Sequence, residues 1–556
     1  MNDLCDEVDK QILHLHSIED MIYGLDINQH AINIGASALT LIAPNVDYNK
    51  MNLYCMQHGK NSDDEVRTGS LDLLIDDHRL NVFGSSGMRT SSDEFIDDRV
   101  KLDNSFDLVI MNPPYTRNDL RNQHYPPELK REIQQREKDI AKEIKHSNTL
   151  LGNAISNTSI ATYFFPIANG LLNKNGVVAT VLPFASSTNP AAKGCRNLLT
   201  NKGDYILELV VTSHDNNRIY FSGNTTIHEC LAIAKKETKN NRNKKAAFIS
   251  LYKNPSNISQ AIDLAESIKK SLQGNIENLK KNYGNIIFRD QNFIRGKIWN
   301  DTCFYDFNLS EQWNKMLFNS CKPDSALQRI EKVSKIIDGR GIRGSFCRSK
   351  IPHSYTSIWY HNENRNTLLT NFDSYMYAKN GKESKAQKLW EEKTHLFVAQ
   401  KIRWSTISVL APYTKNKMLG NACIPIIPAL ESGYLIDDLN LISKAWCLYL
   451  NSTYGILGFL NTRGKDLQYS LFSIDTIKSL LIPNSYKCDI NLMANTFDKL
   501  SENQLKPISL INCDKIRKQI DDCVFKAIPG LFDAEPIREK IANEPSVHQR
   551  KKSNLV

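Results

Sequence analysis

One stretch of the 556-residue sequence reads Ser105-Phe106-Asp107-Leu108-Val109-Ile110-Met111-Asn112-Pro113-Pro114-Tyr115. Its apolar run predicts a strand at 106–111, which Pro113 and Pro114 must end because proline donates no hydrogen bond to a sheet ladder. Two consecutive prolines also stiffen the backbone directly after the strand. Open sheets of parallel strands bind ligands beyond the carboxyl ends of their strands. The stretch therefore predicts a rigid loop at the ligand-binding edge of a sheet.

Short apolar segments alternate with amphipathic ones on both sides of this stretch, between residues 20 and 236. Such alternation is typical of a mainly parallel sheet whose two faces are covered by helices. The predicted fold class of this half is therefore α/β. The predicted strands are 21–25, 106–111, 176–182, 206–212 and 230–234. The predicted helices are 29–42 and 162–172, and a turn is predicted at 173–176.

The second half of the chain has a different pattern. Residues 237–245 are polar and basic, which predicts either a loop at a domain edge or a solvated hairpin tip. Residues 258–282 read as one helix that is broken near Gly274. Short strands, aromatic residues and Gly or Asn turns over 330–427 predict an α+β module. Short helical pieces over 505–556 predict a helical tail with a frayed end.

The composition limits the classes of protein to which this chain can belong. No apolar run approaches the ~18 residues of a membrane span, and the acidic N-terminus is unlike a secretory signal, so we expect a cytoplasmic protein. The 12 cysteines include no Cys-x-x-Cys pair, which predicts reduced structural thiols and no metal site. The formal net charge of +9 favours binding to a polyanion but identifies none by itself.

The residue types after the predicted strand suit one kind of reaction. The exocyclic amine of a nucleobase is a poor nucleophile because its lone pair is delocalised into the ring, so a catalyst must accept its hydrogens. The side-chain oxygen of Asn112 and the carbonyl of Pro113 can supply two acceptors. Tyr115 offers a flat ring against which an unstacked base can rest. The alternative is a structural Asn-Pro-Pro turn with a packed tyrosine.

The tetrapeptide Asn112-Pro113-Pro114-Tyr115 resembles the catalytic motif of the amino-group DNA methyltransferases. In that family Asn-Pro-Pro-Tyr indicates N6 of adenine, whereas Ser-Pro-Pro-Tyr is more usual for N4 of cytosine. The resemblance implies a Rossmann-like sheet that uses S-adenosylmethionine to methylate N6 of adenine in double-stranded DNA, within a restriction–modification system. The same geometry also serves methylation of RNA or of a protein glutamine amide, although those enzymes are usually shorter.

The resemblance also implies cofactor-binding residues. One predicted strand ends at Asp26, which is expected to bind the ribose hydroxyls of the cofactor. Its alternative role is to cap the following helix, which Asn28 can do equally well. Val66–Leu71 resembles the turn beside the cofactor adenine, with Ser70 where the family often has Asp or Asn. Asn112 is expected to contact the cofactor as well as the base.

A second aromatic residue is expected at the target base. Arg218–Thr226 precedes the predicted strand at 230–234 and resembles the segment whose aromatic side chain stacks on the flipped adenine. Phe221 is the expected stacking residue, opposite Tyr115, and Tyr220 is the next candidate. The alternative for Phe221 is packing in the core.

One motif of the family is missing from the sequence. Related enzymes carry a Gly-rich turn just upstream of the acidic strand end, where it cradles the methionine part of the cofactor. The 20 residues before Met21 contain no glycine, and residues 4–17 read as the helix that follows such a turn. We therefore expect a chain that lacks the first strand and binds S-adenosylmethionine poorly, and that is either truncated or completed by an upstream polypeptide. The alternative is a catalytically impaired DNA-binding remnant.

The C-terminal half resembles, more loosely, the target-recognition region fused to such enzymes. The glycines of Ile337–Gly344 allow backbone to approach a phosphate, while Arg340 and Arg343 can pair with phosphates or guanine edges. An exposed basic turn is an equal alternative. Arg117, the third candidate for contact with DNA, lies in a long insert whose mixed-charge helix at 127–146 is predicted to be a solvated face. No nuclease motif is apparent.

Four parts are predicted from these features. A methyltransferase domain without its first strand and Gly-rich loop occupies residues 1–245, and a helical connector follows at 246–329. A target-recognition domain occupies 330–485, and a helical tail occupies 486–556. Residues 448–452, within the third part, predict a buried helix end with no chemical role.

Overall fold

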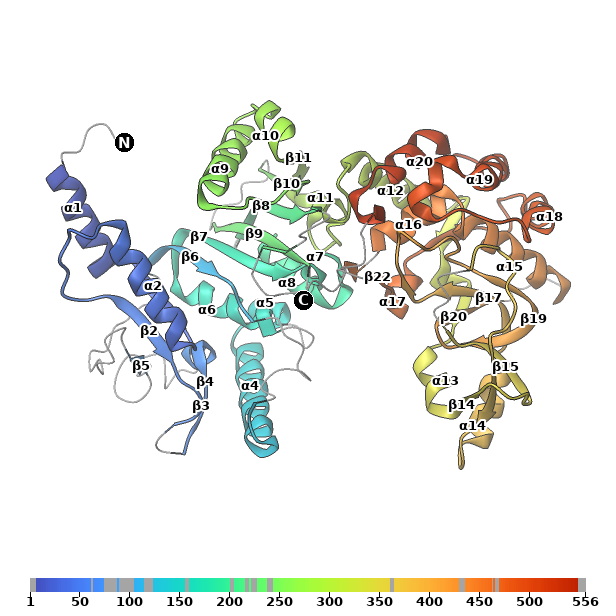
Figure 1. Cartoon of the computed structure of the whole chain (residues 1–556), viewed down its shortest axis with the longest axis horizontal. Coiled ribbons are helices and arrows are strands. Elements are labelled where there is room, and N and C mark those ends of the chain that lie inside the picture. Colours follow the sequence, from blue (N-terminus) through green and yellow to red (C-terminus); the bar gives the residue numbers. More distant parts are fainter. Residues whose placement is uncertain are drawn as a thin grey trace. The chain divides into compact units, whose positions relative to one another are not determined.

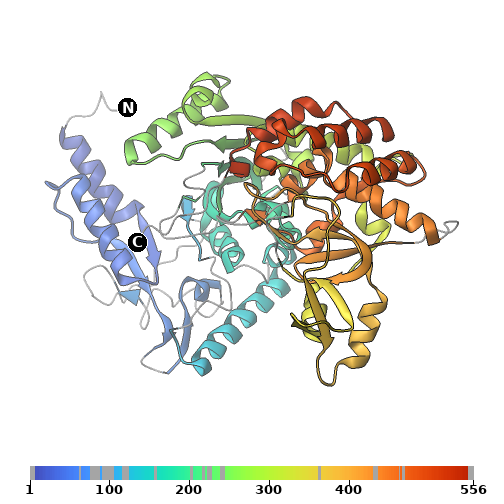
Figure 2. The same cartoon turned by 45° about the vertical axis from the view of Figure 1, so that its right-hand side comes forward.

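The computed structural model describes residues 7–61, 64–74, 88–89, 105–114, 124–155, 160–200, 205–215, 220–221, 228–237, 244–360, 365–429, 436–462, 464–465 and 470–548. The fold is mixed α/β, and Figures 1 and 2 show its elements coloured along the sequence. The chain forms two units. Unit 1 comprises Met1–Leu182, Ala191–Leu207 and Ile233–Lys244, and unit 2 comprises Pro183–Pro190, Glu208–Ala232 and Lys245–Val556. Within the described ranges no helix is long and apolar enough to cross a membrane.

The strand predicted at 106–111 is confirmed as β6 (Phe106–Met111), at the edge of a six-stranded sheet with the order β11-β10-β8-β9-β7-β6. β6 pairs in parallel with β7, and β8 in parallel with β10, whereas β10 and β11 are antiparallel. Four of the predicted strands therefore belong to one sheet. The remaining strands are β7 (Leu172–Pro183), β8 (Tyr205–Ser213), β9 (Glu229–Lys236), β10 (Lys245–Leu251) and β11 (Gly284–Asp290).

The turn predicted at 173–176 is wrong, because these residues continue β7. The pairing passes from Phe106 opposite Leu172 to Leu108 opposite Val177, so the extra residues bulge out of the ladder. Asn175 has a φ of 69°, a left-handed conformation that asparagine tolerates better than most residues. The polar residues that suggested a turn therefore form a β-bulge.

The first predicted strand forms as β1 (Tyr23–Asp26) but belongs to another sheet. In that sheet β1 pairs in parallel with β2 (Asn52–Met56), which pairs with β5 (Met88–Arg89). The rings of Tyr23 and Phe106 lie 5.3 Å apart, edge to face, so the first residues of β1 and β6 lie together. No strand in the described part of the chain pairs with the second edge of β1 or of β6. The expectation of one continuous sheet is therefore wrong for β1.

The helices of unit 1 follow the predicted pattern. α2 (Gln29–Ile42) has the predicted bounds, and the predicted mixed-charge helix forms as α4 (Pro127–Ser147). Its charged residues, such as Glu132, Lys138 and Lys142, form the predicted solvated face, while Ile133, Ile140 and Ile144 are buried on the other side. The other helical elements and hairpin strands are α1 (Glu7–His16), η1 (Ser17–Met21), β3 (His58–Lys60), β4 (Val66–Thr68), η2 (Gly69–Leu74), α5 (Thr149–Ala154), η3 (Ile160–Tyr163), α6 (Phe164–Leu171) and α8 (Lys193–Leu199).

Unit 2 contains a seven-stranded mixed sheet in the region predicted to be rich in short strands. Its order is β13-β20-β17-β19-β15-β16-β14. The strands are β13 (Ser334–Ile336), β14 (Phe346–Ser349), β15 (Tyr355–Ile358), β16 (Ser374–Ala378), β17 (Thr394–Ala399), β19 (Tyr413–Gly420) and β20 (Cys423–Pro428). Two small sheets join β12 (Leu327–Arg329) to β23 (Leu481–Pro483), and β18 (Lys401–Ile402) to β22 (Ser470–Leu471) and β21 (Gly464–Lys465).

The helices of unit 2 include the predicted broken pair. α9 (Ile258–Leu272) and α10 (Glu277–Asn282) are separated at Gly274, whose φ of +104° ends the first helix. The buried helix end predicted at 448–452 is confirmed at the end of α15 (Ile436–Leu450). The other helices are α7 (Ala185–Thr188), α11 (Gln291–Ile294), α12 (Phe307–Ser320), α13 (Gly339–Ser345), α14 (Glu383–Glu391), α16 (Thr453–Thr462), α17 (Ile474–Lys478), α18 (Ile490–Leu500), α19 (Lys515–Ala527) and α20 (Ala534–Ala542), with short turns η4 (Pro190–Ala192), η5 (Asn300–Cys303), η6 (Ile330–Lys332), η7 (Ile508–Cys513) and η8 (Pro545–His548).

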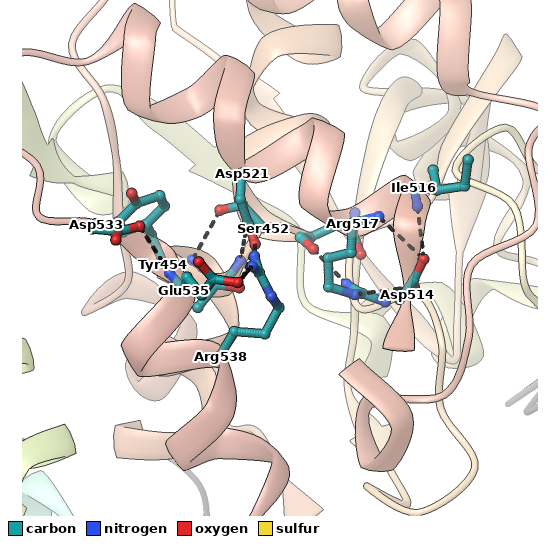
Figure 3. Close-up of polar contacts among 12 residues, drawn as sticks. Ser452, Tyr454, Asp514, Ile516, Arg517, Asp521, Asp533, Glu535 and Arg538 are labelled. Carbon is teal, nitrogen blue, oxygen red and sulfur yellow. Dashed lines mark hydrogen bonds and ion pairs between the residues drawn. The ribbon is translucent and has the colours of Figure 1, made fainter. Parts of the chain in front are cut away.

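Buried charges fasten the last helices to the rest of unit 2 (Figure 3). Arg538 of α20 lies 2.5 Å from the carboxylate of Asp521 of α19, which also accepts the backbone N–H and the hydroxyl of Thr453 at 2.7 Å. Arg517 donates to the carbonyl of Asn451 at 2.5 Å. Burial raises the pKa of Asp521 and lowers the pKa of Arg517. These hydrogen bonds offset the cost of removing the charges from water.

The last described turn of the chain returns to the end of β8. Glu544 is buried, and its carboxylate accepts the backbone N–H of Tyr305 at 3.0 Å. The same carboxylate lies 3.4 Å from Nδ1 of His214, the residue that follows β8. Residues more than two hundred positions apart in the sequence therefore share one buried polar contact.

Candidate functional site

The loop after β6 carries Asn112, whose side-chain amide has no hydrogen-bond partner among the described residues. Asn112 and Pro114 are exposed, whereas Pro113 is buried. No hydrogen bond or ion pair joins the Asn112 side chain to another described residue, so its amide oxygen is available as an acceptor. Tyr115 and Arg117, which the sequence assigned to the target base and to DNA, lie outside the described residues.

The strand that carries Asn112 is unusually exposed for a parallel strand. Leu108 is 51% exposed and Ile110 is 75% exposed, although parallel strands are normally buried on both faces. β6 pairs only with β7 among the described strands, so its other edge leaves backbone N–H and C=O groups free of a ladder. The unpaired edge of β6 therefore has the apolar side chains that are typical of a strand paired on both edges.

Asp26 ends β1, as predicted, with an exposed carboxylate. Its Oδ1 accepts the backbone N–H of Asn28 at 2.7 Å. Asn28, not Asp26, caps α2, because the Asn28 side chain accepts the N–H of His30 at 2.9 Å. The alternative role of Asp26 as the helix cap is therefore taken by Asn28, and the proposed cofactor role stays a prediction.

Ser70 lies close to the end of β1. It is half-exposed in η2 and follows Gly69, which has a φ of +68°. A Cβ atom at Gly69 would lie 2.7 Å from Ile27, the residue after Asp26, so only glycine permits this approach. The fold thus brings together the turns that contain the two predicted cofactor residues, Asp26 and Ser70.

A buried carboxylate that the sequence did not single out holds the Ser70 turn. Asp72 is 4% exposed and accepts the N–H and the hydroxyl of Thr68, both at 2.8 Å. It also accepts Nε of Arg136 from α4 at 2.9 Å. The partner lies 64 positions away, so no local pattern marks Asp72 as a positioning residue.

Tyr220 and Phe221 belong to unit 2 and are both half-buried. The N–H of Phe221 donates to Oε2 of the buried Glu229 at 2.6 Å. The carbonyl of Tyr220 accepts Nδ2 of Asn254 at 3.2 Å. Glu229 and Asn254, neither of them anticipated, therefore fix the backbone beside the predicted stacking residue. The stacking role of Phe221 itself stays a prediction.

Arg340 and Arg343 lie on a short helix, not on the predicted turn. Asp338 caps α13 by accepting the N–H of Arg340 at 2.8 Å, which favours the helix although the segment is glycine-rich. The guanidinium of Arg340 is 82% exposed and pairs with Asp338, and it holds the pKa of that carboxyl below its usual value. Arg343 is exposed without such a partner among the described residues, so its charge is the more available for phosphate.

One family of known proteins matches the part of the chain that contains several of the candidate residues. Residues 20–217 match the family model described as Eco57I restriction-modification methylase. The matched range includes Asp26, Ser70 and Asn112 and ends before Phe221. No curated protein matches the chain.

Several solved restriction enzymes resemble parts of the chain. The type IIG restriction endonuclease BpuSI is 13% identical over 80% of this chain and 54% of its own, with a TM-score of 0.33. The DrdV–DNA complex is 12% identical over 89% of this chain and 52% of its own, with a TM-score of 0.41. The ATP-dependent type ISP enzyme LlaBIII bound to DNA is 10% identical over 88% and 34%, with a TM-score of 0.43. This chain spans about half or less of their lengths, and such TM-scores add nothing to the assignment of function.

Proposed function

We propose that this chain acts as a restriction–modification DNA methyltransferase, with a Rossmann-like catalytic sheet, that methylates N6 of adenine from S-adenosylmethionine. The observation that carries the proposal is the position of Asn112. Its amide follows a parallel strand directly, is exposed, and is hydrogen-bonded by no described residue. The family match supports the proposal because it spans the same residues.

The chemistry follows from the acceptors on the loop. The Asn112 side-chain oxygen and the Pro113 carbonyl accept the two hydrogens of the adenine amine, which favours a pyramidal nitrogen with its lone pair directed at the methyl donor. S-adenosylmethionine supplies an activated methyl group, so no strong base is needed. Tyr115 and Phe221 are proposed to stack on the two faces of the extruded base.

The residues present fit one end of the cofactor. In our proposal the exposed carboxylate of Asp26 binds the ribose hydroxyls, and Ser70 lies beside the cofactor adenine, because the Ile27–Gly69 contact brings the two turns together. No described glycine turn adjoins them for the methionine end. The isolated chain is therefore expected to bind S-adenosylmethionine weakly.

An upstream polypeptide is proposed to supply the missing strand and glycine turn. The observation in favour is the pair of free edges: β1 and β6 start side by side at Tyr23 and Phe106, yet neither pairs with the other. Both strands already form one parallel pairing, so a third parallel strand would satisfy both edges. It would also cover the apolar side chains of Leu108 and Ile110.

Replacing Asn112 tests the proposed chemistry. The chain is produced together with the polypeptide encoded upstream, and digested DNA is assayed by mass spectrometry for N6-methyladenine and N4-methylcytosine. Asn112→Ala should reduce N6-methyladenine by about 100-fold or more, the usual effect of removing one stabilising group from a reaction site, while DNA affinity stays unchanged. Asn495→Ala, at an exposed asparagine of α18, is the matched control. Undiminished methylation by Asn112→Ala would refute the assigned role.

Calorimetric titration tests the partner separately. S-adenosylmethionine is titrated into the chain alone and into the chain with the upstream polypeptide. We expect saturable binding only for the pair. Tight stoichiometric binding by the chain alone would remove the partner from the proposal, and binding by neither would leave the catalytically impaired DNA-binding protein as the better description.

A further inference from the structure

Three strands at one end of the seven-stranded sheet carry a distinctive row of side chains. Cys347 of β14 lies opposite Tyr377 of β16, and Tyr375 of β16 lies opposite Ser349 of β14 and Thr356 of β15. Directly opposed residues share one face of a sheet. We call this surface, made of Cys347, Ser349, Thr356, Tyr375 and Tyr377, the β14–β16 face. In Figures 1 and 2 the strands lie with α13 and α14 at the end of unit 2 farthest from α19 and α20.

The opposite face of these strands is covered. Phe346 and Met376 alternate with the residues of the β14–β16 face and are buried in a cluster with Ala386 of α14. Tyr355 packs edge-on against Trp390 of α14 at 5.0 Å. The helices therefore stabilise the strands from one side, and the core does not require the tyrosines of the other side.

The β14–β16 face itself remains accessible. Tyr377 is 43% exposed, and the other four members are partly exposed. Two further rings extend the face at its rim, His353 at 4.9 Å from Tyr377 and Phe372 at 5.0 Å from Tyr375. Interaction with the Cys347 side chain raises the pKa of Tyr377, whose hydroxyl therefore stays protonated and can donate. The face thus combines aromatic rings with short polar groups.

The charges around the face are mainly positive. From Gly339 to Lys379 the chain has six arginines and lysines and two acidic residues. Arg343, Arg348 and Lys350 are exposed, and none of them forms an ion pair with a described residue. The acidic Asp373 is already bound by Arg365 at 2.9 Å. The face therefore complements a polyanion.

We infer that the β14–β16 face enters the major groove of duplex DNA and contributes to reading the sequence that the enzyme modifies. The major groove admits a β-ribbon, and the hydroxyls of Thr356 and Tyr377 can bond with base edges there. The Ser349 hydroxyl instead donates to the Ile351 carbonyl at 2.9 Å. Arg348 lies opposite Met376, on the other side of the edge strand β14, and its long exposed side chain binds a flanking phosphate past that edge, as Lys350 does. These contacts position the face but carry no sequence information. The inference rests on the proposed function, since it names the surface through which that enzyme selects its DNA.

Two sets of variants distinguish recognition of the DNA sequence from binding to the DNA phosphates. The full chain is incubated, without cofactor, with a pool of random-sequence duplexes, and bound DNA is sequenced; affinity is then measured for the selected and for unselected duplexes. Tyr377→Phe with Thr356→Val removes two hydroxyls from the face. We expect it to reduce the preference for selected over unselected DNA by about 10-fold, with affinity for unselected DNA unchanged.

Arg348→Ala with Lys350→Ala should weaken binding to all duplexes alike and reduce the slope of log affinity against log salt by about 2, one for each lost phosphate contact. The matched controls are Tyr486→Phe, at an exposed tyrosine of unit 2, and Lys499→Ala with Lys515→Ala, at exposed lysines of α18 and α19. Both controls should bind and select DNA like the parent chain.

Three outcomes would overturn the inference. The variant that lacks the two hydroxyls selects the same sequences as the parent chain, or the parent chain selects no duplex. The third is that the parent chain binds single-stranded RNA through Tyr377 more tightly than it binds duplex DNA. Binding is measured without cofactor or upstream polypeptide, so failure of methyl transfer leaves this test intact. If the chain transfers methyl groups but the variant that lacks the two hydroxyls keeps the sequence preference of the parent, the inference is refuted and the proposed function stands.

Discussion

At the scale of single residues, Asp72 shows how one carboxylate can order a turn. It accepts two hydrogen bonds from Thr68 and one from Arg136 while almost fully buried. Asp72→Ala leaves these donors without an acceptor, and each unsatisfied buried donor costs about 1–3 kcal/mol. We expect the free energy of unfolding to fall by at least about 2 kcal/mol in urea titrations. Asp139→Ala, at an exposed carboxylate of α4, should change it by less than about 0.5 kcal/mol, and equal effects would contradict the role of Asp72.

His395 of β17 should make stability depend on pH. Burial lowers the pKa of His395, with a smaller contribution from Lys417 and Lys444. Protonation therefore favours the unfolded chain: the stability is complete above the unfolded pKa of about 6.5 and is lost as pH falls through the lower folded value. We expect the free energy of unfolding to decline as the pH falls below the unfolded pKa of about 6.5.

His395→Asn should flatten that decline, because asparagine cannot be protonated and can still donate to the Thr414 carbonyl, which lies 2.8 Å from Nδ1. Denaturant titrations at several pH values measure the slope, and His146→Asn, at an exposed histidine of α4, is the control. An identical slope for His395→Asn and the parent would show that other groups control the decline.

Some site residues could be predicted from the sequence and others could not. The exposed position of Asn112 after a strand follows from the apolar run and the two prolines, which are local features. The described cysteines are free thiols, as their spacing indicated. Asp72 and Glu229 escaped prediction because their roles depend on partners that only the fold brings near. The exposed basic turn that was the alternative for Arg340 is a short helix, because Asp338 caps it by accepting the N–H of Arg340.

At the scale of elements, the free edge of β6 should govern solution behaviour. An edge strand that is apolar after Asp107, as β6 is, invites pairing with another chain. We expect the isolated chain to self-associate, and Leu108→Lys to reduce light scattering by placing a charge on that edge. Leu41→Lys, at an exposed leucine of α2 away from any strand edge, is the control for lost hydrophobicity. Unchanged scattering for Leu108→Lys would place the association elsewhere.

Elements with a strong period were predicted well, and irregular ones were not. α2 has its predicted bounds because its apolar residues recur at helical spacing over four turns. The break at Gly274 also follows from the sequence, since the left-handed φ there suits glycine. Residues 173–176 were mistaken for a turn because Asn and Gly favour both turns and bulges, and only pairing with β6 distinguishes the two.

At the scale of the whole chain, the buried charges of the C-terminal helices should hold unit 2 together. Arg517 donates to the carbonyls of Asn451 and Ser408, at 2.5 and 2.8 Å, and lies beside Asp514. Arg517→Ala removes all of these contacts and leaves a buried carboxylate unpaired, which typically costs about 3–5 kcal/mol. We expect a clearly lower thermal midpoint, measured by circular dichroism. Lys515→Ala, at an exposed lysine of the same helix, should leave the midpoint unchanged. Similar midpoints for both variants would contradict the stabilising role of Arg517.

The separation of β1 from the main sheet is a property of the whole chain that no local pattern contains. Each strand was recognisable by its apolar residues, but the neighbour of a strand depends on which other strands are present to bridge it. Between β1 and β6 no described strand does so, although the rings of Tyr23 and Phe106 are in contact. The four-part domain division inferred from composition remains a prediction.

The buried carboxylate of Glu544 fixes where the protein tolerates engineering. A shortened chain that stops before this residue leaves the amide of Tyr305 without its acceptor and removes the carboxylate that lies beside His214. A purification tag or fluorescent reporter therefore belongs after His548, beyond the last described turn, and any trimming of the tail for crystallisation should stop there as well.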